Sequence, residues 1–342
     1  MKPGTLKILV IVLSLAAAVA LVVVAAVVAG AMYWFNARAA DEQLAAGYAA
    51  YQSGDWDEAI NSYSEAIRRR PRQAGGYLWR GYAYEAKEDW DNALSDYNQA
   101  IRLEPNNAYN YDHRARVHVA QRAWDQALSD SDKALRLSTN AAWAYDWRGR
   151  VHLDREEWDQ GIRDYTEAIR LDRTDWYAYS SRAGAFAHLR QWDKALSDCE
   201  EAIRLSPRNI MPFHTRAEVR VQQGKPEEAV GDFREAIRLD PTNPQALNGL
   251  AWLLATSPSA AVRDGKEAVT VAKQACERDG WKHYAFVDTL AAAYAEDDDF
   301  DQAIHYQKQA LSMAKPTDKF QTEGQQRLEL YQQRKPYREP PK

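Results

Sequence analysis

Residues 90–105 read WDNALSDYNQAIRLEP, and residues 192–207 read WDKALSDCEEAIRLSP. The Trp-Asp pair that opens both stretches recurs every 34 residues along the chain. Its tryptophans are Trp56, Trp90, Trp124, Trp158 and Trp192. A fixed period of this length is typical of repeat architectures, in which each unit is one supersecondary element that buries its apolar face against its neighbours.

Small residues and prolines recur on the same period. Three positions after the tryptophan stand Ala59, Ala93, Ala127, Gly161 and Ala195. Small side chains there let two helices approach closely. Units close at Pro71, Pro105, Pro207 and Pro241. Because proline cannot continue a helix, each unit is predicted to be a hairpin of two antiparallel α-helices.

The arrangement of small residues, aromatics and proline resembles the signature of the tetratricopeptide repeat (TPR) family. The positions that carry the resemblance are Gly47, Gly81 and Gly149, the aromatics Tyr63, Tyr97 and Phe233, and the closing prolines. The resemblance implies an all-α fold, a right-handed superhelical solenoid of antiparallel helix hairpins. Counted from the tryptophans, the solenoid covers 36–316 in about eight repeats, 40–73, 74–107, 108–141, 142–175, 176–209, 210–243, 244–283 and 284–316.

The C-terminal part departs from the regular pattern. Leu254 and Ala268 are fourteen residues apart where the family has nine, so a longer loop is expected around Ser257. Residues 317–334 are predicted to form a capping helix, because the last hairpin has no neighbour to cover its apolar face. Residues 335–342 are expected to form a flexible tail.

The N-terminal segment predicts a membrane anchor. Residues 8–35 carry no charged side chain, and this run exceeds the roughly 20 residues that a helix needs to cross a bilayer core. Lys2 and Lys7 precede the run, so the positive-inside rule places residues 1–7 in the cytoplasm and the repeats on the extracytoplasmic, periplasmic side of a bacterial cell envelope. The alternative is a cleaved signal peptide, for which Ala29-Gly30-Ala31 offers a site.

Composition argues against several classes of function. The 342-residue chain has a net charge of −5, whereas nucleic-acid binding needs a basic excess on one face. Cys199 and Cys276 are too few and too far apart for a disulfide framework or a metal site. We find no phosphate-binding loop, nucleophile elbow or zinc-ligand spacing. We therefore predict no enzymatic activity, no cofactor and no metal.

Arginine and aspartate also follow the 34-residue period, in repeats two to six. They lie about equally far on either side of the hairpin turn, so each arginine should face the aspartate of its own or the neighbouring repeat. We predict an ion-pair ladder formed by the arginines Arg80, Arg114, Arg148, Arg182 and Arg216 and the aspartates Asp96, Asp130, Asp164, Asp198 and Asp232. The Trp-Asp pairs are predicted to serve packing and helix capping.

In TPR folds the first helix of each repeat lines the inner, concave surface. The family's groove positions in repeats two to five hold Trp79, Tyr82, Tyr109, Asp112, His113, Arg116, Trp143, Asp146, Trp147, Arg150 and Tyr177. Aromatic rings with arginine are typical of binding hot spots, so we predict a groove for a peptide or protein partner, in which Asp112/Arg116 and Asp146/Arg150 fix polar ends. The alternative is that these rings pack between adjacent repeats.

The family's carboxylate clamp, which grips the C-terminus of a partner chain, is not expected. The comparable positions hold Leu44, Tyr48, Trp79, Tyr109 and His113 instead of the required lysine, asparagine and arginine. The sequence therefore predicts a single-pass, membrane-anchored scaffold that binds protein partners by another route. The alternative is a structural or self-assembling envelope element without a ligand groove.

Overall fold

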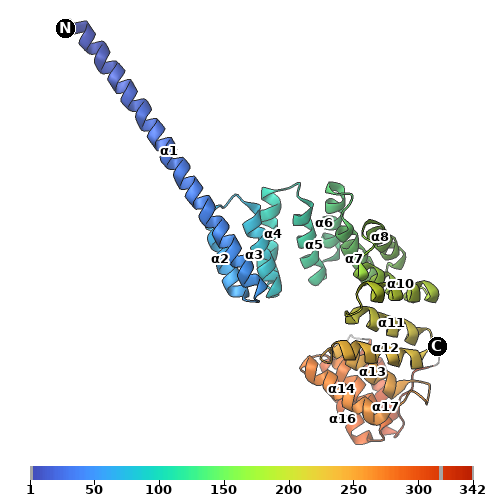
Figure 1. Ribbon diagram of the computed structural model, residues 1–342. Coiled ribbons are helices and arrows are strands. Elements are labelled where there is room, and N and C mark those ends of the chain that lie inside the picture. The colour runs from blue at the N-terminus through green and yellow to red at the C-terminus, as the bar shows by residue number, and fades with distance from the viewer. Residues whose placement is uncertain (1–2, 316–318, 341–342) are drawn as a thin grey trace. The chain divides into compact units, whose positions relative to one another are not determined.

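The computed structural model describes residues 3–315 and 319–340, with side chains described from residue 21 onward. Residues 1–2, 316–318 and 341–342, which lie at the ends of predicted segments, are outside the described residues. Within the described ranges every regular element is an α-helix (Figure 1). The all-α prediction is confirmed.

The helices follow one another at short intervals. They are α1 (Pro3–Gln52), α2 (Trp56–Arg69), α3 (Ala74–Ala86), α4 (Trp90–Leu103), α5 (Ala108–Ala120), α6 (Trp124–Leu137), α7 (Ala142–Asp154), α8 (Trp158–Leu171), α9 (Trp176–His188), α10 (Trp192–Leu205), α11 (Ile210–Gln222), α12 (Pro226–Leu239), α13 (Pro244–Thr256), α14 (Gly265–Asp279), α15 (Tyr284–Glu296), α16 (Phe300–Met313) and α17 (Phe320–Gln332). Consecutive helices pack as hairpins in α1/α2, α3/α4, α5/α6, α9/α10, α11/α12, α13/α14 and α15/α16. The chain divides into two compact units, residues 1–151 and 152–342, which are described separately below.

Helix α1 joins the apolar N-terminal segment to the first repeat without a break. Among the described residues one stretch, Leu21–Gln52, is long and apolar enough to cross a membrane, and its apolar part is not buried in the protein. The predicted span 8–35 and the predicted start of the solenoid at residue 36 thus lie on the same helix. Toward its C-terminal end α1 packs against α2 as the first helix of the first hairpin.

Glycines in the first helices make room for aromatic rings from the second. A β-carbon added at Gly81 would lie 2.5 Å from Cε1 of Tyr97, and one at Gly47 would lie 2.6 Å from Cε1 of Tyr63. Both tyrosines are fully buried. The small residue of the repeat signature therefore fixes how closely the two helices of a hairpin pack.

The turns of the first six repeats contain a residue in the left-handed region, two positions before the recurring tryptophan or, in the sixth repeat, before Pro226. Positive φ angles occur at Gly54, Glu88, Arg122, Glu156, Arg190 and Gly224. The following backbone N–H donates to the carbonyl five residues earlier, as from Asp89 to Tyr84 at 2.9 Å, which closes the first helix in a Schellman-type cap. Four of the six positions hold a residue other than glycine and carry the steric cost of that conformation.

In the first two repeats, the residue before the tryptophan caps the second helix. Asp55 and Asp89 accept hydrogen bonds from the backbone N–H groups of Glu58 and Asn92, at 3.1 and 3.4 Å. The aspartate after the tryptophan lies within the first turn, where its charge favours the helix dipole. The expectation that the Trp-Asp pair supplies the cap is therefore wrong in these repeats.

The C-terminal segment is not a free tail. After α17, the backbone N–H of Glu339 donates to the carbonyl of Thr256 at 2.8 Å, and the Arg338 guanidinium forms an ion pair with Glu296. Residues 335–340 thus pack on the second unit, contrary to the expectation of a flexible tail at 335–342. The sequence pattern did not reveal this because the contacts join residues more than forty positions apart.

Candidate functional site

Aromatic rings connect the first helices of the first three repeats. Tyr48 of α1 lies with its ring centroid 5.5 Å from that of Trp79 on α3, and Trp79 lies 5.1 Å from Tyr82. The Tyr82 ring is 4.5 Å from the ring of His113 on α5, in an edge-to-face arrangement. These distances are those of favourable aromatic pairs, so the rings hold adjacent repeats together.

A second ring pair lies between α5 and α7. The rings of Tyr109 and Trp143 stack with centroids 5.2 Å apart, and Trp143 also packs on the buried cluster around Tyr111. Tyr109 is 57% exposed and Tyr48 is 47% exposed. Beyond the apolar stretch of α1, the exposed large aromatic side chains among the described residues are these two and Trp281. The first-helix face of the first unit therefore presents two aromatic rings to solvent, each backed by a tryptophan.

Arg116 is held by a residue that the sequence analysis did not select. Its guanidinium donates to Glu85 of α3 at 2.7 Å and lies 5.5 Å from the centroid of the Tyr82 ring. Glu85 also accepts a hydrogen bond from the Tyr97 hydroxyl at 2.7 Å. Arg116 thus bridges two repeats and does not pair with Asp112, four residues before it, to present a polar end. A basic residue 31 positions from an acidic one has no local signal in the sequence.

Asp112 and His113 lie inside the first unit. Each is 8% exposed. Burial raises the pKa of Asp112 to about 7, while Arg116 and a hydrogen bond from the Trp147 side chain oppose the shift and Glu85 adds to it. Burial lowers the pKa of His113 to about 3, and the nearby positive charge of Arg116 adds to the effect. The side chains of these two predicted groove residues therefore lie mostly in the interior behind the rings.

The other predicted groove residues lie on α7 and α9. Trp147 is half-buried and its indole donates to Asp112, whereas Arg150 is exposed and Asp146 is partly buried. Tyr177 belongs to the second unit, where its ring centroid lies 6.0 Å from Trp176 and 6.4 Å from Tyr165. The predicted groove set is thus concentrated in the first unit, except for Tyr177.

Replacing Asp112 by asparagine should change how stability depends on pH. Because the folded-state pKa of Asp112 is raised from 3.8 to about 7, folding favours its protonated form, so its contribution is full below pH 3.8 and is lost as pH rises through 7. Asparagine does not ionise, so Asp112→Asn avoids this loss. Relative to the native chain, the variant should be more stable at pH 8 than at pH 3.8, by up to about 4 kcal/mol in the free energy of unfolding. Urea denaturation across this range measures the difference. Asp91→Asn, at an exposed aspartate, is the matched control, and an equal pH profile for the two variants would contradict the assignment.

The arginines of the predicted ladder meet aspartates 16 residues later in the same hairpin. Nε of Arg80 and of Arg182 donate at 2.8 Å to Asp96 and Asp198, and a second nitrogen of each guanidinium donates to the other carboxylate oxygen at 2.8 Å. Arg114 and Asp130 form the same two-pronged pair at 2.8 and 2.6 Å. Arg148 and Asp164 belong to different units, so their relative placement is not described.

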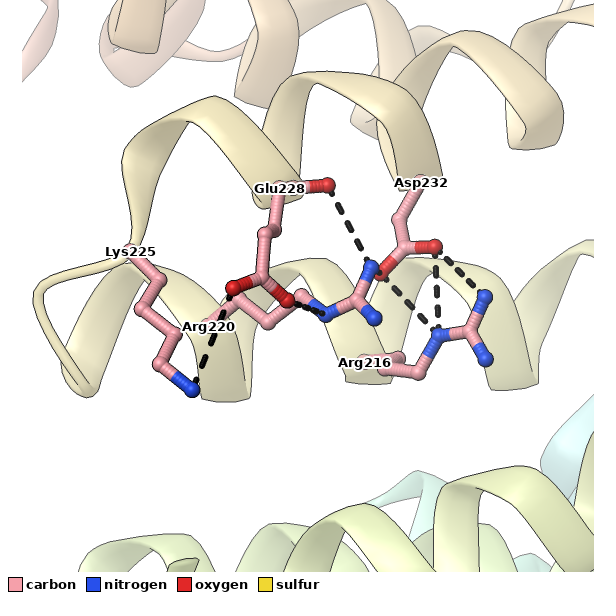
Figure 2. A network of polar contacts seen from close by, with 5 residues as sticks. All are labelled: Arg216, Arg220, Lys225, Glu228 and Asp232. Carbon is pink, nitrogen blue, oxygen red and sulfur yellow. Dashed lines mark hydrogen bonds and ion pairs between the residues drawn. The ribbon is translucent and has the colours of Figure 1, made fainter.

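The fifth pair is part of a larger network (Figure 2). Arg216 and Arg220 of α11 both point toward Asp232 of α12, with contacts of 2.7 Å to its two carboxylate oxygens. Glu228 lies 3.4 Å from Nε of Arg220 and 3.8 Å from Lys225. One buried aspartate therefore balances two arginines here.

The ladder arginines also reach the preceding repeat, which the sequence analysis missed. Nη1 donates to the side chain 16 residues before the arginine, in the second helix of the previous hairpin. The observed pairs are Arg80 with Ser64 at 2.9 Å, Arg114 with Asn98 at 2.6 Å, Arg148 with Asp132 at 2.7 Å and Arg182 with Thr166 at 3.0 Å. These acceptors are polar residues of different types that recur every 34 residues. That recurrence is the sequence signal from which they could have been predicted. Each of these arginines therefore joins two hairpins.

The ladder pairs are weakly solvated. Burial raises the pKa of Asp96 despite the opposing effect of Arg80, whereas the hydrogen bond to Asp96 raises the pKa of Arg80. The raised pKa of Arg80 indicates a favourable ion pair, whereas the raised pKa of Asp96 indicates that burial disfavours the charged carboxylate. Because the Asp96 side chain is 6% exposed, its desolvation outweighs the attraction of the guanidinium. Such a pair adds little net stability, but losing one partner leaves a buried charge.

We predict a strong coupling between Arg182 and Asp198. Asp198→Ala should lower the free energy of unfolding by about 3–5 kcal/mol, because it strands the guanidinium. Arg182→Met combined with Asp198→Ala should cost much less than the sum of the two single changes. A double-mutant cycle by urea denaturation measures this, with the exposed Arg204–Glu201 pair as control. Additive effects at Arg182 and Asp198 would contradict a ladder role.

The described residues offer no group of three or more His, Cys, Asp or Glu that could hold a metal ion. Cys199 and Cys276 are buried free thiols, and burial raises the pKa of each to about 12. His118 lies 3.7 Å from Asp130, on the margin of a ladder pair. These groups take part in packing and in the ladder.

The hairpins, their turns and the arginine pairs define a helical-repeat protein. Residues 44–108 and residues 169–320 each match a family model described as tetratricopeptide repeat. Together the two matches span more than half of the 342 residues. The chain belongs to the tetratricopeptide repeat family, whose members are typically scaffolds for protein–protein interaction.

Solved structures share this fold at low sequence identity. Yeast Tom70 is 21% identical with a TM-score of 0.60, and the match covers 86% of this chain and 65% of Tom70. The Cut9–Hcn1 hetero-tetramer of the APC/C is 13% identical with a TM-score of 0.64, covering 84% of this chain and 55% of the matched chain. A TPR protein from Parabacteroides merdae is 15% identical with a TM-score of 0.54, covering 86% and 99%. No curated protein matches the sequence.

Proposed function

We propose that this protein is a membrane-anchored scaffold that binds a segment of a partner protein on the first-helix face of its first unit. The observation that carries the proposal is the pair of exposed rings, Tyr48 and Tyr109, at groove positions of the family. Each ring rests on a tryptophan, Trp79 or Trp143, so it is presented in a fixed orientation. Rigid aromatic side chains bury a large area at a small entropic cost.

The surroundings of the two rings favour a partner with apolar groups. Arg116, beside the Tyr82 ring, is paired with Glu85, so its charge is balanced within the protein. Asp112 is buried, so its negative charge is withdrawn from the surface. A short extended or helical segment with apolar anchors fits this face, whereas a free C-terminal carboxylate lacks the basic clamp that it needs.

Alanine at both exposed rings should abolish partner capture. Tyr48→Ala/Tyr109→Ala removes the two contact rings but leaves Trp79 and Trp143 in place. Crosslinking from native membranes, followed by mass spectrometry, should recover a partner with the intact chain and at least about tenfold less with the variant, since losing hot-spot rings costs 2 kcal/mol or more. Trp281→Ala removes a comparably exposed ring of the second unit and is the matched control.

The outcomes separate the two candidate functions. Loss of capture with the double variant and retention with Trp281→Ala would support the groove. Equal recovery with all three chains would contradict it. Recovery of nothing but copies of this chain would favour the self-assembling envelope element.

The proposed anchor is the apolar part of α1. Its exposed large side chains run from Leu21 to Phe35, a surface suited to lipid and costly in water. Tyr33, Trp34 and Phe35 lie at the end of this stretch, where aromatic residues favour a membrane interface. With Lys2 and Lys7 on the cytoplasmic side, the repeats would face the periplasm of a bacterial cell.

The uncleaved anchor predicts a membrane protein of full mass. After alkaline carbonate washing, the chain should stay in the pellet, and its mass should be the 38.9 kDa of all 342 residues. Val24→Arg/Val27→Arg places two charges in the apolar stretch, at about 2.5–3.5 kcal/mol each, and should release the protein. A soluble native chain that begins at Met32 would instead establish a cleaved signal peptide.

A further inference from the structure

The segment that follows α17, residues 335–340, forms no regular secondary structure and folds back onto other helices of the second unit. Arg334 adopts a left-handed conformation with φ of 56°, and the Lys335 N–H donates to the Leu330 carbonyl at 2.9 Å, which ends the helix. The chain then runs back to α13, where Glu339 N–H donates to the carbonyl of Thr256 at 2.8 Å.

Tyr337 is held by two residues from separate helices. Its ring centroid lies 6.0 Å from that of Trp252 on α13 and 5.5 Å from the Arg327 guanidinium on α17. Arg327 is itself fixed by an ion pair of 3.0 Å with the buried Asp288. The Arg327 guanidinium and the Trp252 indole therefore form a preorganised binding site for an aromatic ring.

Arg338 and Glu339, the next two residues, make polar contacts with α15 and α13. The Arg338 guanidinium pairs with Glu296 of α15, a carboxylate that is 12% exposed and also lies 3.1 Å from Arg263. The Glu339 carboxylate accepts a hydrogen bond from Nε1 of Trp252 at 3.3 Å. The second unit thus contacts the ring of Tyr337, the guanidinium of Arg338, and the backbone amide and carboxylate of Glu339. Side-chain pockets combined with backbone hydrogen bonds are typical of sites that bind extended peptides.

Beyond Glu339 the site continues into an apolar cavity. The cavity measures about 260 Å³ and is lined by Val221, Pro226, Trp252, Pro258 and Pro340, among others. Among the described residues of the segment, Glu339 and Pro340 contribute to its wall. A longer apolar side chain at this point of a ligand would find room there.

We propose that Trp252, Thr256, Glu296 and Arg327, together with this cavity, form a second peptide-binding site, which the chain's own segment 335–340 occupies in cis. Its ligand is an extended segment of a partner protein with an aromatic residue and an arginine at the places of Tyr337 and Arg338, and an apolar side chain for the cavity two positions after the arginine. The segment at 335–340 satisfies the first two requirements and places Pro340 at the cavity wall, so it is a competitor that a better-matched partner displaces. The site lies in the second unit and stands independently of the proposed groove in the first.

Binding of the segment in trans tests the proposal. A fluorescently labelled peptide of residues 334–342, RKPYREPPK, is titrated into the intact chain and into the full-length variant Tyr337→Ala/Arg338→Glu, whose own segment is released. The tethered segment acts at an effective concentration on the order of mM, so the peptide should bind the variant at least about tenfold more tightly than the intact chain. The control peptide carries Arg338→Glu and should not bind either chain.

A folding control and a second peptide complete the experiment. A melting curve by circular dichroism shows whether the double variant is folded, and Arg338→Glu alone, which keeps the Tyr337 ring, replaces it if it is not. A peptide with leucine in place of Pro340 should bind the released chain more tightly than the native sequence, because leucine reaches into the cavity. Failure of the peptide to bind a folded released chain, equal binding to the intact chain, or equal binding of the control peptide would overturn the proposal.

Discussion

The repeat stack depends on an arginine that bonds to two hairpins at once. In the first helix of a repeat, its guanidinium grips the buried aspartate of the second helix and reaches a polar side chain of the preceding repeat. It also lies 5.4–5.9 Å from an aromatic ring three residues before it, namely Tyr77, Tyr111, Tyr145, Tyr179 or Phe213. A planar, five-donor cation satisfies all these partners together, which lysine does not. The angle between neighbouring hairpins is therefore set by directional bonds as well as by apolar packing.

Periodicity predicts what is repeated and local. The helices, the closing prolines and the Arg and Asp columns all follow from the 34-residue spacing. The left-handed turn residue was harder to find, since glycine marks it at Gly54 and Gly224 but Glu88 and three others replace it elsewhere. The Glu85–Arg116 contact and the folded-back segment after α17 escape prediction because each joins positions distant in sequence and occurs once.

The aromatic face of the first unit contains both rings that pack between repeats and rings that remain exposed. Trp79, Tyr82 and Trp143 pack between repeats, whereas Tyr48 and Tyr109 sit on them and remain about half exposed. Family positions identify which helix face is involved but not how deep each side chain lies. Depth depends on neighbouring volumes, which is why Asp112 and His113 proved to be interior. A partner that binds the exposed rings would also press on the contacts that join the repeats.

Helix α1 has a geometric consequence for the proposed membrane-anchored form. Because it runs unbroken from Pro3 to Gln52, its apolar part and the first repeat share one helical phase. Each residue inserted between them would rotate the repeats by about 100° around the helix axis and shift them by about 1.5 Å along it. If the apolar part is held in a bilayer as proposed, the number of residues in α1 would therefore set the direction in which Tyr48 and Tyr109 face relative to the membrane surface.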